Sequence, residues 1–333
     1  GWLVAQAPVL LAGGAVSEVA AWIPALRVEL SFRLGLVQWL LALVVTGIGA
    51  VVLWYCRWYF AGVASQPRVV GLLTAFCAAM IGLVTADDLI LLYVFWEATT
   101  VFSYLLIGHD PTRRANRSAA LTALIVTTTG GLAMLVGLIA LGQAAGTNSL
   151  AAIVAAPPSG ALVMLAAPLI LAGALSRSAM APFHFWLPGA MAAPTPISAY
   201  LHAAAMVKAG VYLVAVFAPV LAGQPGWRPA VWTLGALTLF LGGWRALRQD
   251  DLKLLLAYGT VSQLGLLVLL VGTGTQAAAL GGMAMLIAHA LFKATAFLVV
   301  GIVDHGTGTR QLSELSGVGR SLPLTATVAG IAA

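Results

Sequence analysis

One stretch, Leu162 to Val216, constrains the fold of this chain more than any other. It holds an apolar run that breaks at Ser176 to Pro182, a proline-rich link, and a second apolar run that carries His202 and Lys208. A guanidinium, an imidazole and an amine are each costly in lipid, and proline prevents the nearby backbone from completing its hydrogen bonds. The sequence therefore predicts a broken membrane helix enclosed by other protein segments.

Composition supports a membrane setting. The 333 residues are 61% hydrophobic and only 8% charged, with a mean hydropathy of +1.01, whereas soluble domains have roughly 25% charged residues. The two cysteines, Cys56 and Cys77, have no metal-ligand spacing, and no phosphate loop or nucleophile triad is present. We expect an all-α polytopic membrane protein that is not an enzyme and that has no cofactor and no metal site.

Hydropathy predicts about ten to eleven transmembrane helices, since a crossing takes about 20 apolar residues. The predicted spans are residues 36–56, 69–86, 88–108, 118–142, 161–181, 197–218, 229–247, 252–272 and 278–302, with a weaker run at 2–16 and a partial one from 322. The partial run, and a start without methionine, suggest an internal piece of a longer protein.

Basic residues alternate between loops from the second predicted helix onward. The Arg-rich loops contain Arg57 and Arg68, then Arg113, Arg114 and Arg117, then Arg245, Arg248 and Lys253, then Arg310 and Arg320. By the positive-inside rule these loops, and the 183–195 link, are cytoplasmic; Arg27 and Arg33 break the alternation. Because the cations are spread over separate loops, the net charge of +6 does not indicate nucleic-acid binding.

The chain has only three lysines, Lys208, Lys253 and Lys293, and all lie in or at the edge of predicted spans. Arginine does not release its proton in a protein, whereas burial can bring the pKa of a lysine toward neutrality. The lysines are therefore candidate carriers of exchangeable protons. The alternative is that they extend to the membrane interface, which fits Lys253 best.

Glu97 falls near the middle of a predicted span, where a carboxylate must be paired or protonated. It is either a structural partner for a buried cation or a protonatable site coupled to one. His289 and Lys293 are four residues apart and share a helix face, while His202 lies six residues before Lys208. Two helices that each carry a histidine and a lysine favour a proton relay over isolated core histidines.

Several segments resemble one family, the antiporter-like subunits of respiratory complex I and of the Mrp-type multisubunit Na⁺/H⁺ antiporters. They are Phe95–Thr99, Ser103–Gly108, Pro182–Met191 with Pro194–Pro196, Met206–Tyr212, Asp251–Lys253, Thr260–Gly265 and His289–Lys293. Phe183–Pro188 and Val299–His305 are most similar to the large A-type component of the Mrp antiporter, and the L-type component of complex I is the closest rival.

The resemblance implies two inverted five-helix repeats, each with a discontinuous helix. Residues 1–68 would be N-terminal transmembrane helices, 69–218 the first repeat, and 229–333 an incomplete second repeat. It also implies a Glu/Lys/His proton relay, Na⁺ and H⁺ as transported ions, other antiporter subunits as partners, and a bacterial cell membrane. The alternatives are a proton-pumping arm of an NADH-quinone oxidoreductase and a non-transporting membrane scaffold.

Two positions depart from the family pattern. Arg177 stands where the family has a lysine on its first broken helix, and Met285 stands where it usually has a histidine one turn before the one matching His289. Since arginine retains its proton, we expect a fixed ion pair between Glu97 and Arg177, with the exchangeable proton carried by Lys208.

Overall fold

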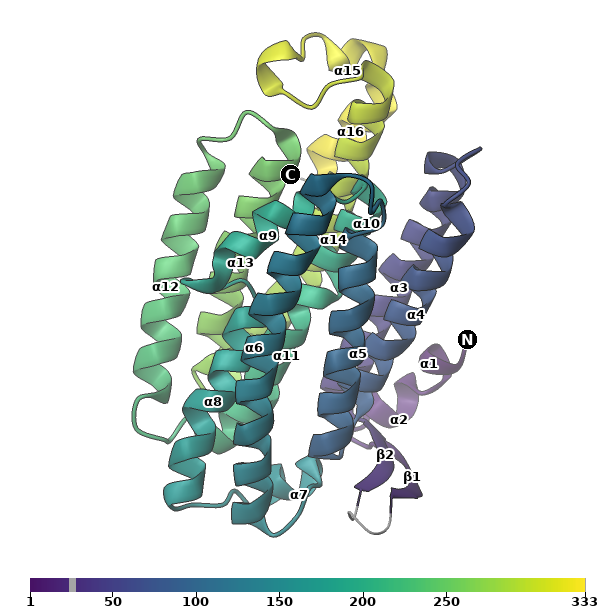
Figure 1. The fold of residues 1–333 in the computed structure, drawn as a ribbon. Helices are drawn as coiled ribbons and strands as arrows, with labels where there is room; N and C mark the ends of the chain where they lie inside the picture. The colour runs from purple at the N-terminus through teal and green to yellow at the C-terminus, as the bar shows by residue number, and fades with distance from the viewer. Residues whose placement is uncertain (24–27, 333) are drawn as a thin grey trace.

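The computed structural model describes residues 1–23 and 28–332, which form a bundle of long helices with a small N-terminal hairpin (Figure 1). The long helices are α3 (Leu36–Tyr59), α4 (Gln66–Thr85), α5 (Leu89–Ile107), α6 (Arg114–Ala145), α8 (Ala161–Arg177), α11 (Met206–Leu221), α12 (Trp227–Ala246), α13 (Leu252–Gly272) and α14 (Gln276–Thr307). Short elements are α7 (Leu150–Ala155), η5 (Leu312–Glu314), α15 (Val318–Ser321) and α16 (Pro323–Ala332). The mostly helical fold predicted from hydropathy is confirmed.

Seven helical segments in the described part of the chain are long and apolar enough to cross a membrane. One of them, Thr195–Leu221, is the centre of the bundle: 83% of its most apolar window is buried inside the protein, against 39–56% for the other six. α13 has the predicted bounds, while α6 and α14 extend to 32 residues each. A helix buried on all sides can carry polar groups that lipid would not tolerate.

The predicted span at residues 2–16 is wrong. That segment forms two short helices, α1 (Trp2–Ala5) and α2 (Ala7–Leu11), followed by an antiparallel hairpin of β1 (Val16–Ile23) and β2 (Val28–Leu34). Gly13 has a φ of 85°, which ends the helix, and a strand begins three residues later. Arg27 lies outside the described residues.

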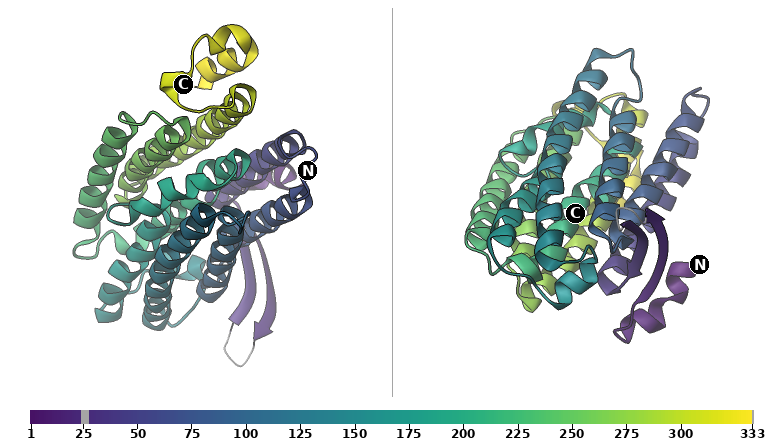
Figure 2. Two further views of the ribbon diagram at one scale, coloured as in Figure 1. Left: turned by 45° about the horizontal axis from the view of Figure 1, so that its top comes forward. Right: turned by 60° about the horizontal axis from the view of Figure 1, so that its bottom comes forward.

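The predicted helix break is present. α8 ends at Arg177, and the link continues through η2 (Phe183–Phe185), α9 (Trp186–Gly189), η3 (Ala190–Ala192) and α10 (Thr195–Ala199) into the π-helical η4 (Tyr200–Ala204) and α11. Figure 2 shows the teal link among the neighbouring helices; α10 and η4 are buried throughout, whereas Phe185 of η2 is exposed. Enclosure is what irregular backbone at membrane depth requires, because its polar groups need partners inside the protein.

Side chains from the surrounding elements tie this link in place. The Trp186 indole N–H donates to the Ser176 carbonyl at 3.0 Å, the Ala181 N–H donates to the Thr238 hydroxyl at 3.0 Å, and the Ser178 hydroxyl donates to the Val207 carbonyl at 2.9 Å. The backbone groups that the break exposes are therefore bonded within the bundle rather than to lipid.

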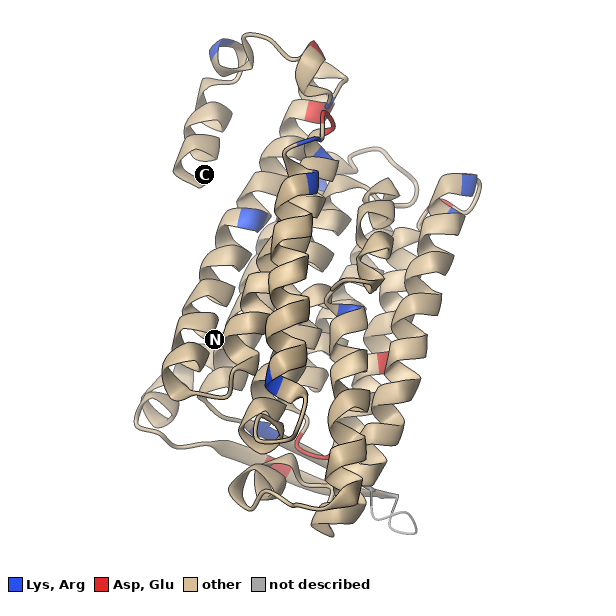
Figure 3. Ribbon diagram, turned by 90° about the vertical axis from the view of Figure 1, so that its left-hand side faces the viewer, with Lys and Arg blue, Asp and Glu red and all other residues tan. Residues whose placement is uncertain are grey.

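Many of the charged residues lie toward the two ends of the bundle, with a few between them (Figure 3). The α3–α4, α5–α6 and α12–α13 connections and the segment after α14 reach one end, here called the basic end, whereas the hairpin and the α4–α5, α11–α12 and α13–α14 connections reach the opposite, cation-poor end (Figure 1). The alternation of basic loops thus matches the geometry. That the basic end is cytoplasmic stays a prediction.

Similar hydrogen bonds to an aspartate join neighbouring segments at each end of the bundle. At the cation-poor end the Asp87 carboxylate accepts from the Ser149 hydroxyl at 2.7 Å and from the Ala151 N–H at 2.9 Å. At the basic end the Asp250 carboxylate accepts from the Ser313 hydroxyl at 2.6 Å and from its N–H at 2.9 Å. This inverted correspondence favours the repeats implied by the family resemblance, whose boundaries stay a prediction.

Candidate functional site

Arg177 lies at the last turn of α8 and is completely buried. Its Nη2 donates to the Trp96 carbonyl at 2.6 Å and to the Thr100 hydroxyl at 2.7 Å, and its Cζ lies 4.3 Å from the centre of the Trp96 ring. The guanidinium therefore contacts α5 through two oxygen acceptors and the face of one aromatic ring. No sequence pattern singled out Thr100, although it lies three residues after Glu97 on the same helix face.

The predicted Arg177–Glu97 ion pair is not among the ion pairs of the described residues, which are Arg113–Asp110 and Arg310–Asp251. Glu97 is half-buried, and its Oε1 has no hydrogen-bond partner within the described chain. The salt bridge is absent because the two side chains point to different partners. Arg177 directs its Nη2 to the α5 backbone and Thr100, while Glu97 Oε1 points toward α6.

Glu97 lies against the glycine pair of α6. A Cβ atom built on Gly131 would collide with Glu97 Oε1, and one built on Gly130 would collide with the Ser176 hydroxyl of α8. The absence of side chains on these glycines brings α5, α6 and α8 together around the carboxylate and the guanidinium, so both charges occupy one buried region without forming a salt bridge.

The closest contact between two titratable side chains at the centre joins Lys208 of α11 to His289 of α14. Lys208 Nζ lies 3.1 Å from His289 Nδ1, and both residues are buried. Lys208 Nζ also donates to the Ala203 carbonyl. Such a contact needs a free lone pair on one of the two nitrogens, so it cannot form when both groups are protonated. The contact is therefore compatible with a proton on Lys208 Nζ or on His289 Nδ1, but not with both nitrogens protonated.

His202, which the sequence paired with Lys208, does not contact it. The π-helical segment Tyr200–Ala204 and the irregular Ala205, with φ −129° and ψ −82°, separate the two residues and change the helical register. The His202 ring lies 6.3 Å from that of Trp186 and 6.4 Å from that of Phe297, and neither ring nitrogen has a partner within the described chain.

Lys293 continues the polar stripe of α14 one turn beyond His289, as predicted. It is only 6% exposed, and its Nζ donates to the Leu256 carbonyl of α13 at 3.4 Å. A Cβ atom on Gly259 would lie 3.1 Å from this nitrogen. The three side chains Lys208, His289 and Lys293 thus connect α11 through α14 to α13.

Lys253 has a different environment. Its Nζ donates to the Met191 carbonyl at 2.9 Å and to the Ala193 carbonyl at 2.6 Å, both in the link of the broken helix. It is 2% exposed, so its side chain is enclosed by the protein. The structure thus places Lys253 against the link and apart from the Lys208–His289 contact.

Close backbone packing holds α11 at the position that brings Lys208 to His289. A Cβ atom on Gly210 would collide with the Ala174 carbonyl of α8 and with the hydroxyl of Ser178, the residue that caps α8. We expect Gly210→Ala to destabilise the protein by about 1–3 kcal/mol, because neither backbone can give way. Gly71→Ala in α4 is the control, since nothing lies within 4 Å of the added carbon. Thermal unfolding in detergent checks both variants, and equal midpoints would contradict this packing.

The side chains of the site include several that can take up and release protons. No three His, Cys, Asp or Glu side chains gather as metal ligands among the residues the structure describes. The candidate groups identified from the sequence are two buried imidazoles, three buried amines and one half-buried carboxylate: His202, His289, Lys208, Lys253, Lys293 and Glu97. An amine and an imidazole in contact can pass a proton without any further group.

Known proteins are similar to this chain in sequence. Residues 86–333 match the family described as NADH:quinone oxidoreductase/Mrp antiporter, transmembrane. The probable A/B component of a K⁺/H⁺ antiporter of Rhizobium meliloti is 44% identical over 98% of this chain and 33% of its own length. The A component of the Na⁺/H⁺ antiporter of Alkalihalophilus pseudofirmus is 40% identical over 98% of this chain and 44% of its own.

A solved structure has the same fold as this chain. The Mrp complex from Dietzia sp. DQ12-45-1b contains a chain that superimposes with a TM-score of 0.90 at 42% identity, over 96% of this chain and 35% of that one. The chain thus spans less than half the length of these relatives. The matched residues include the broken helix and the Lys208–His289 contact. This chain is therefore a multi-pass membrane protein of the NADH:quinone oxidoreductase/Mrp antiporter transmembrane family.

Proposed function

We propose that this chain is part of an ion-translocating component of a multisubunit cation/proton antiporter in a bacterial cell membrane, and that protons cross its centre through Lys208, His289 and Lys293. The observation that carries the proposal is the 3.1 Å contact between Lys208 Nζ and His289 Nδ1, deep in the bundle. A buried amine and imidazole in contact are costly to maintain for packing alone.

The names of the relatives support antiport over an oxidoreductase arm, because two of them are named as antiporter components. They differ in the cation, which is potassium in one name and sodium in the other. We propose sodium as the exchanged cation, with potassium as the alternative that the experiment below separates. Other subunits of the same antiporter are the proposed partners.

The remaining charged residues have proposed roles around this relay. Arg177 supplies a permanent positive charge near Glu97, so that the carboxylate can lose its proton inside the membrane. His202, whose two ring nitrogens lack partners in the described chain, extends the relay between the link and the centre. Lys253 holds the link and adds a titratable charge at the basic end.

The proposed mechanism is coupled titration. A proton that arrives at Lys293 or His289 adds a charge next to Lys208, and two like charges a few ångströms apart repel by about 4 kcal/mol at an effective dielectric constant of 20. That repulsion expels the proton of the neighbouring group, so one protonation drives the next along the stripe. The cation gradient would set the direction of net movement.

A second candidate is a scaffold whose buried charges only hold helices together. Specific contacts favour it: Arg177, Lys208 and Lys253 each donate to backbone carbonyls, of Trp96, Ala203 and of Met191 with Ala193. A scaffold needs the hydrogen bonds but not the exchange of protons, and substitution can separate the two.

The substitution that separates them is His289→Gln, which keeps a polar side chain beside Lys208 but cannot be protonated. We expect it to lower cation-driven proton exchange in everted vesicles by at least about tenfold with the parent complex assembled, because proton transfer by a positioned side chain commonly contributes 10²–10⁴-fold. Exchange is measured with sodium and with potassium. Normal exchange by an assembled His289→Gln complex would exclude the relay and favour the scaffold.

A further inference from the structure

A small polar pocket lies at the cation-poor end of the bundle, next to the hydrogen bond between Ala151 and Asp87 and apart from the Lys208–His289 contact. It has a volume of about 80 Å³ and is lined by Arg33, Gln38, Asp87, Leu150, Ala151 and Val216, among others. Arg33 is exposed, and Gln38, Asp87 and Val216 are half-buried, so the pocket opens at the surface. A cavity needs about 10–15 Å³ of such space for one water molecule, and polar side chains on its wall would bind it.

The lining residue Val216 places this pocket on the same face of α11 as the relay. Lys208, Tyr212 and Val216 are spaced four residues apart, so they form one stripe along the helix, with Lys208 at the centre of the bundle and Val216 at the pocket. Neighbours in such a stripe have Cβ atoms about 5–6 Å apart. Tyr212 is therefore the residue of α11 between the Lys208–His289 contact and the pocket.

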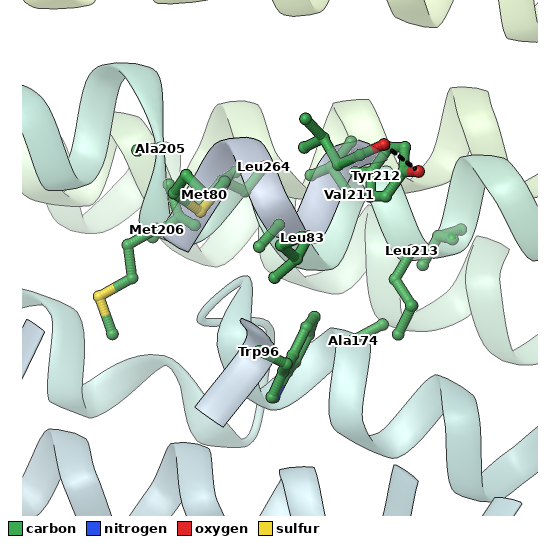
Figure 4. Close-up of a cluster of buried hydrophobic side chains, with 14 of the residues drawn as sticks. Met80, Leu83, Trp96, Ala174, Ala205, Met206, Val211, Tyr212, Leu213 and Leu264 are labelled. Atoms are coloured by element: carbon green, nitrogen blue, oxygen red, sulfur yellow. Dashed lines mark hydrogen bonds between the residues drawn. The ribbon is translucent and has the colours of Figure 1, made fainter. Parts of the chain in front are cut away.

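Tyr212 is 1% exposed, and its hydroxyl donates to the Val84 carbonyl at 2.8 Å. Gln38 and Asp87, which line the pocket, are the polar side chains nearest to this hydroxyl on the pocket side. Figure 4 shows Tyr212, with this bond dashed, in a cluster of buried hydrophobic side chains that includes Met80 and Leu83. A hydroxyl whose neighbours are a pocket glutamine on one side and an apolar cluster on the other is placed at a boundary between water and protein interior.

We propose that this pocket is the aqueous mouth of the relay at the cation-poor end, and that the Tyr212 hydroxyl passes protons between the Lys208 region and the pocket. The proposal rests on the proposed function above. In each transfer the phenolic oxygen accepts one proton from the relay side while its own O–H bond breaks toward pocket water, so tyrosine ends as it began. Rotation of the hydroxyl then restores the starting geometry.

The structure has this route closed. The O–H bond points at the Val84 carbonyl, and the turn of α11 between Lys208 and Tyr212 is buried. Closure at one end is what an antiporter needs, because a continuous proton wire between both sides would dissipate the gradient. Transfer thus requires Tyr212 to leave Val84, which is a side-chain rotation within an otherwise fixed bundle.

Tyr212→Phe in the assembled antiporter complex tests the route, since it removes one oxygen and leaves the packing intact. The matched control is Tyr200→Phe: Tyr200 is also 1% exposed and also donates to a backbone carbonyl, that of Val45 at 3.1 Å, but it does not line the route. We expect at least a tenfold loss of cation-driven proton exchange in Tyr212→Phe and less than a twofold change in Tyr200→Phe.

The exchange activities of the variants distinguish the access route from the relay. Equal exchange by the two tyrosine variants, whether normal or reduced, would overturn the route, since the hydroxyl of Tyr212 would then have no special role. Lys208→Met, tested alongside, separates the two proposals: if it retains exchange, the relay itself is wrong, whereas if it loses exchange and Tyr212→Phe does not, only the access route fails.

A labelling experiment tests the pocket independently of transport. In intact cells, Gln38→Cys should react with a membrane-impermeant maleimide, because the pocket is open and the cation-poor end is predicted to face outward. Leu83→Cys, at a completely buried position, should not react above the background of the parent protein. Lack of reaction at Gln38→Cys in cells and in everted vesicles alike would show that the pocket is closed to water on both sides and would overturn the proposal.

Discussion

Replacing Lys208 by methionine should abolish cation-driven proton exchange while the complex still assembles. Methionine has a similar length and no charge, and exchange of a buried charge for a hydrophobic side chain of similar volume is often neutral for stability. The variant loses the contact with His289 Nδ1, which is the only direct link between α11 and the α14 stripe that two titratable groups make in the described structure. The expected loss is on the order of 10²-fold or more.

The measurement is proton uptake by everted vesicles after addition of sodium or potassium, with the amount of assembled complex determined in parallel. Lys208→Arg is the informative companion, because arginine keeps the positive charge and hydrogen bonds but does not release its proton. Loss of exchange in both variants supports an exchangeable proton at this position. Exchange retained by Lys208→Arg would mean that only a fixed charge is needed there.

Arg177→Lys should change the pH profile of exchange by on the order of one pH unit. A lysine keeps the charge near Glu97 but lacks the planar guanidinium, whose Nη2 donates to both Trp96 and Thr100 and whose face lies over the Trp96 ring. A charge-assisted hydrogen bond contributes about 1.5–3 kcal/mol. Since one pKa unit corresponds to about 1.4 kcal/mol, the loss of one such bond is large enough to move the titration of the site. Lysine also adds a second group that can release a proton.

The control for this prediction is Arg248→Lys. Arg248 also lies over a tryptophan, with its Cζ 4.3 Å from the Trp244 ring centre, but it is exposed at the end of the bundle. We expect its pH profile to match that of the parent protein. If Arg177→Lys behaved in the same way as this control, the division of labour between a fixed charge at Arg177 and an exchangeable proton at Lys208 would be incorrect.

The predictions that held depend on local properties of the chain. Runs of about 20 apolar residues are long enough to cross a membrane, and this located α3 to α6, α11, α13 and α14; α12 is a helix as predicted but is not among the seven candidate spans of the described residues. Proline and a charged residue within such a run marked the break after Arg177, because both effects act on the adjacent backbone. Hydropathy alone does not predict the hairpin β1–β2, because the apolar run at 2–16 continues through Gly13, whose positive φ lies between the end of α2 and the start of β1.

Sequence by itself therefore determined the membrane class of this protein, the position of its broken helix and the identity of the buried titratable residues. Only the tertiary structure decided which of them meet. Lys208 contacts His289, 81 residues away, instead of His202, because one π-helical turn changes the register and α14 packs against that segment. Likewise Arg177 donates to the backbone of α5 and forms no salt bridge with Glu97, and Val216, one turn after Tyr212, lines a pocket formed by distant elements. Local patterns fix which side chains are buried, but helix packing fixes their neighbours, and proton transfer depends on neighbours.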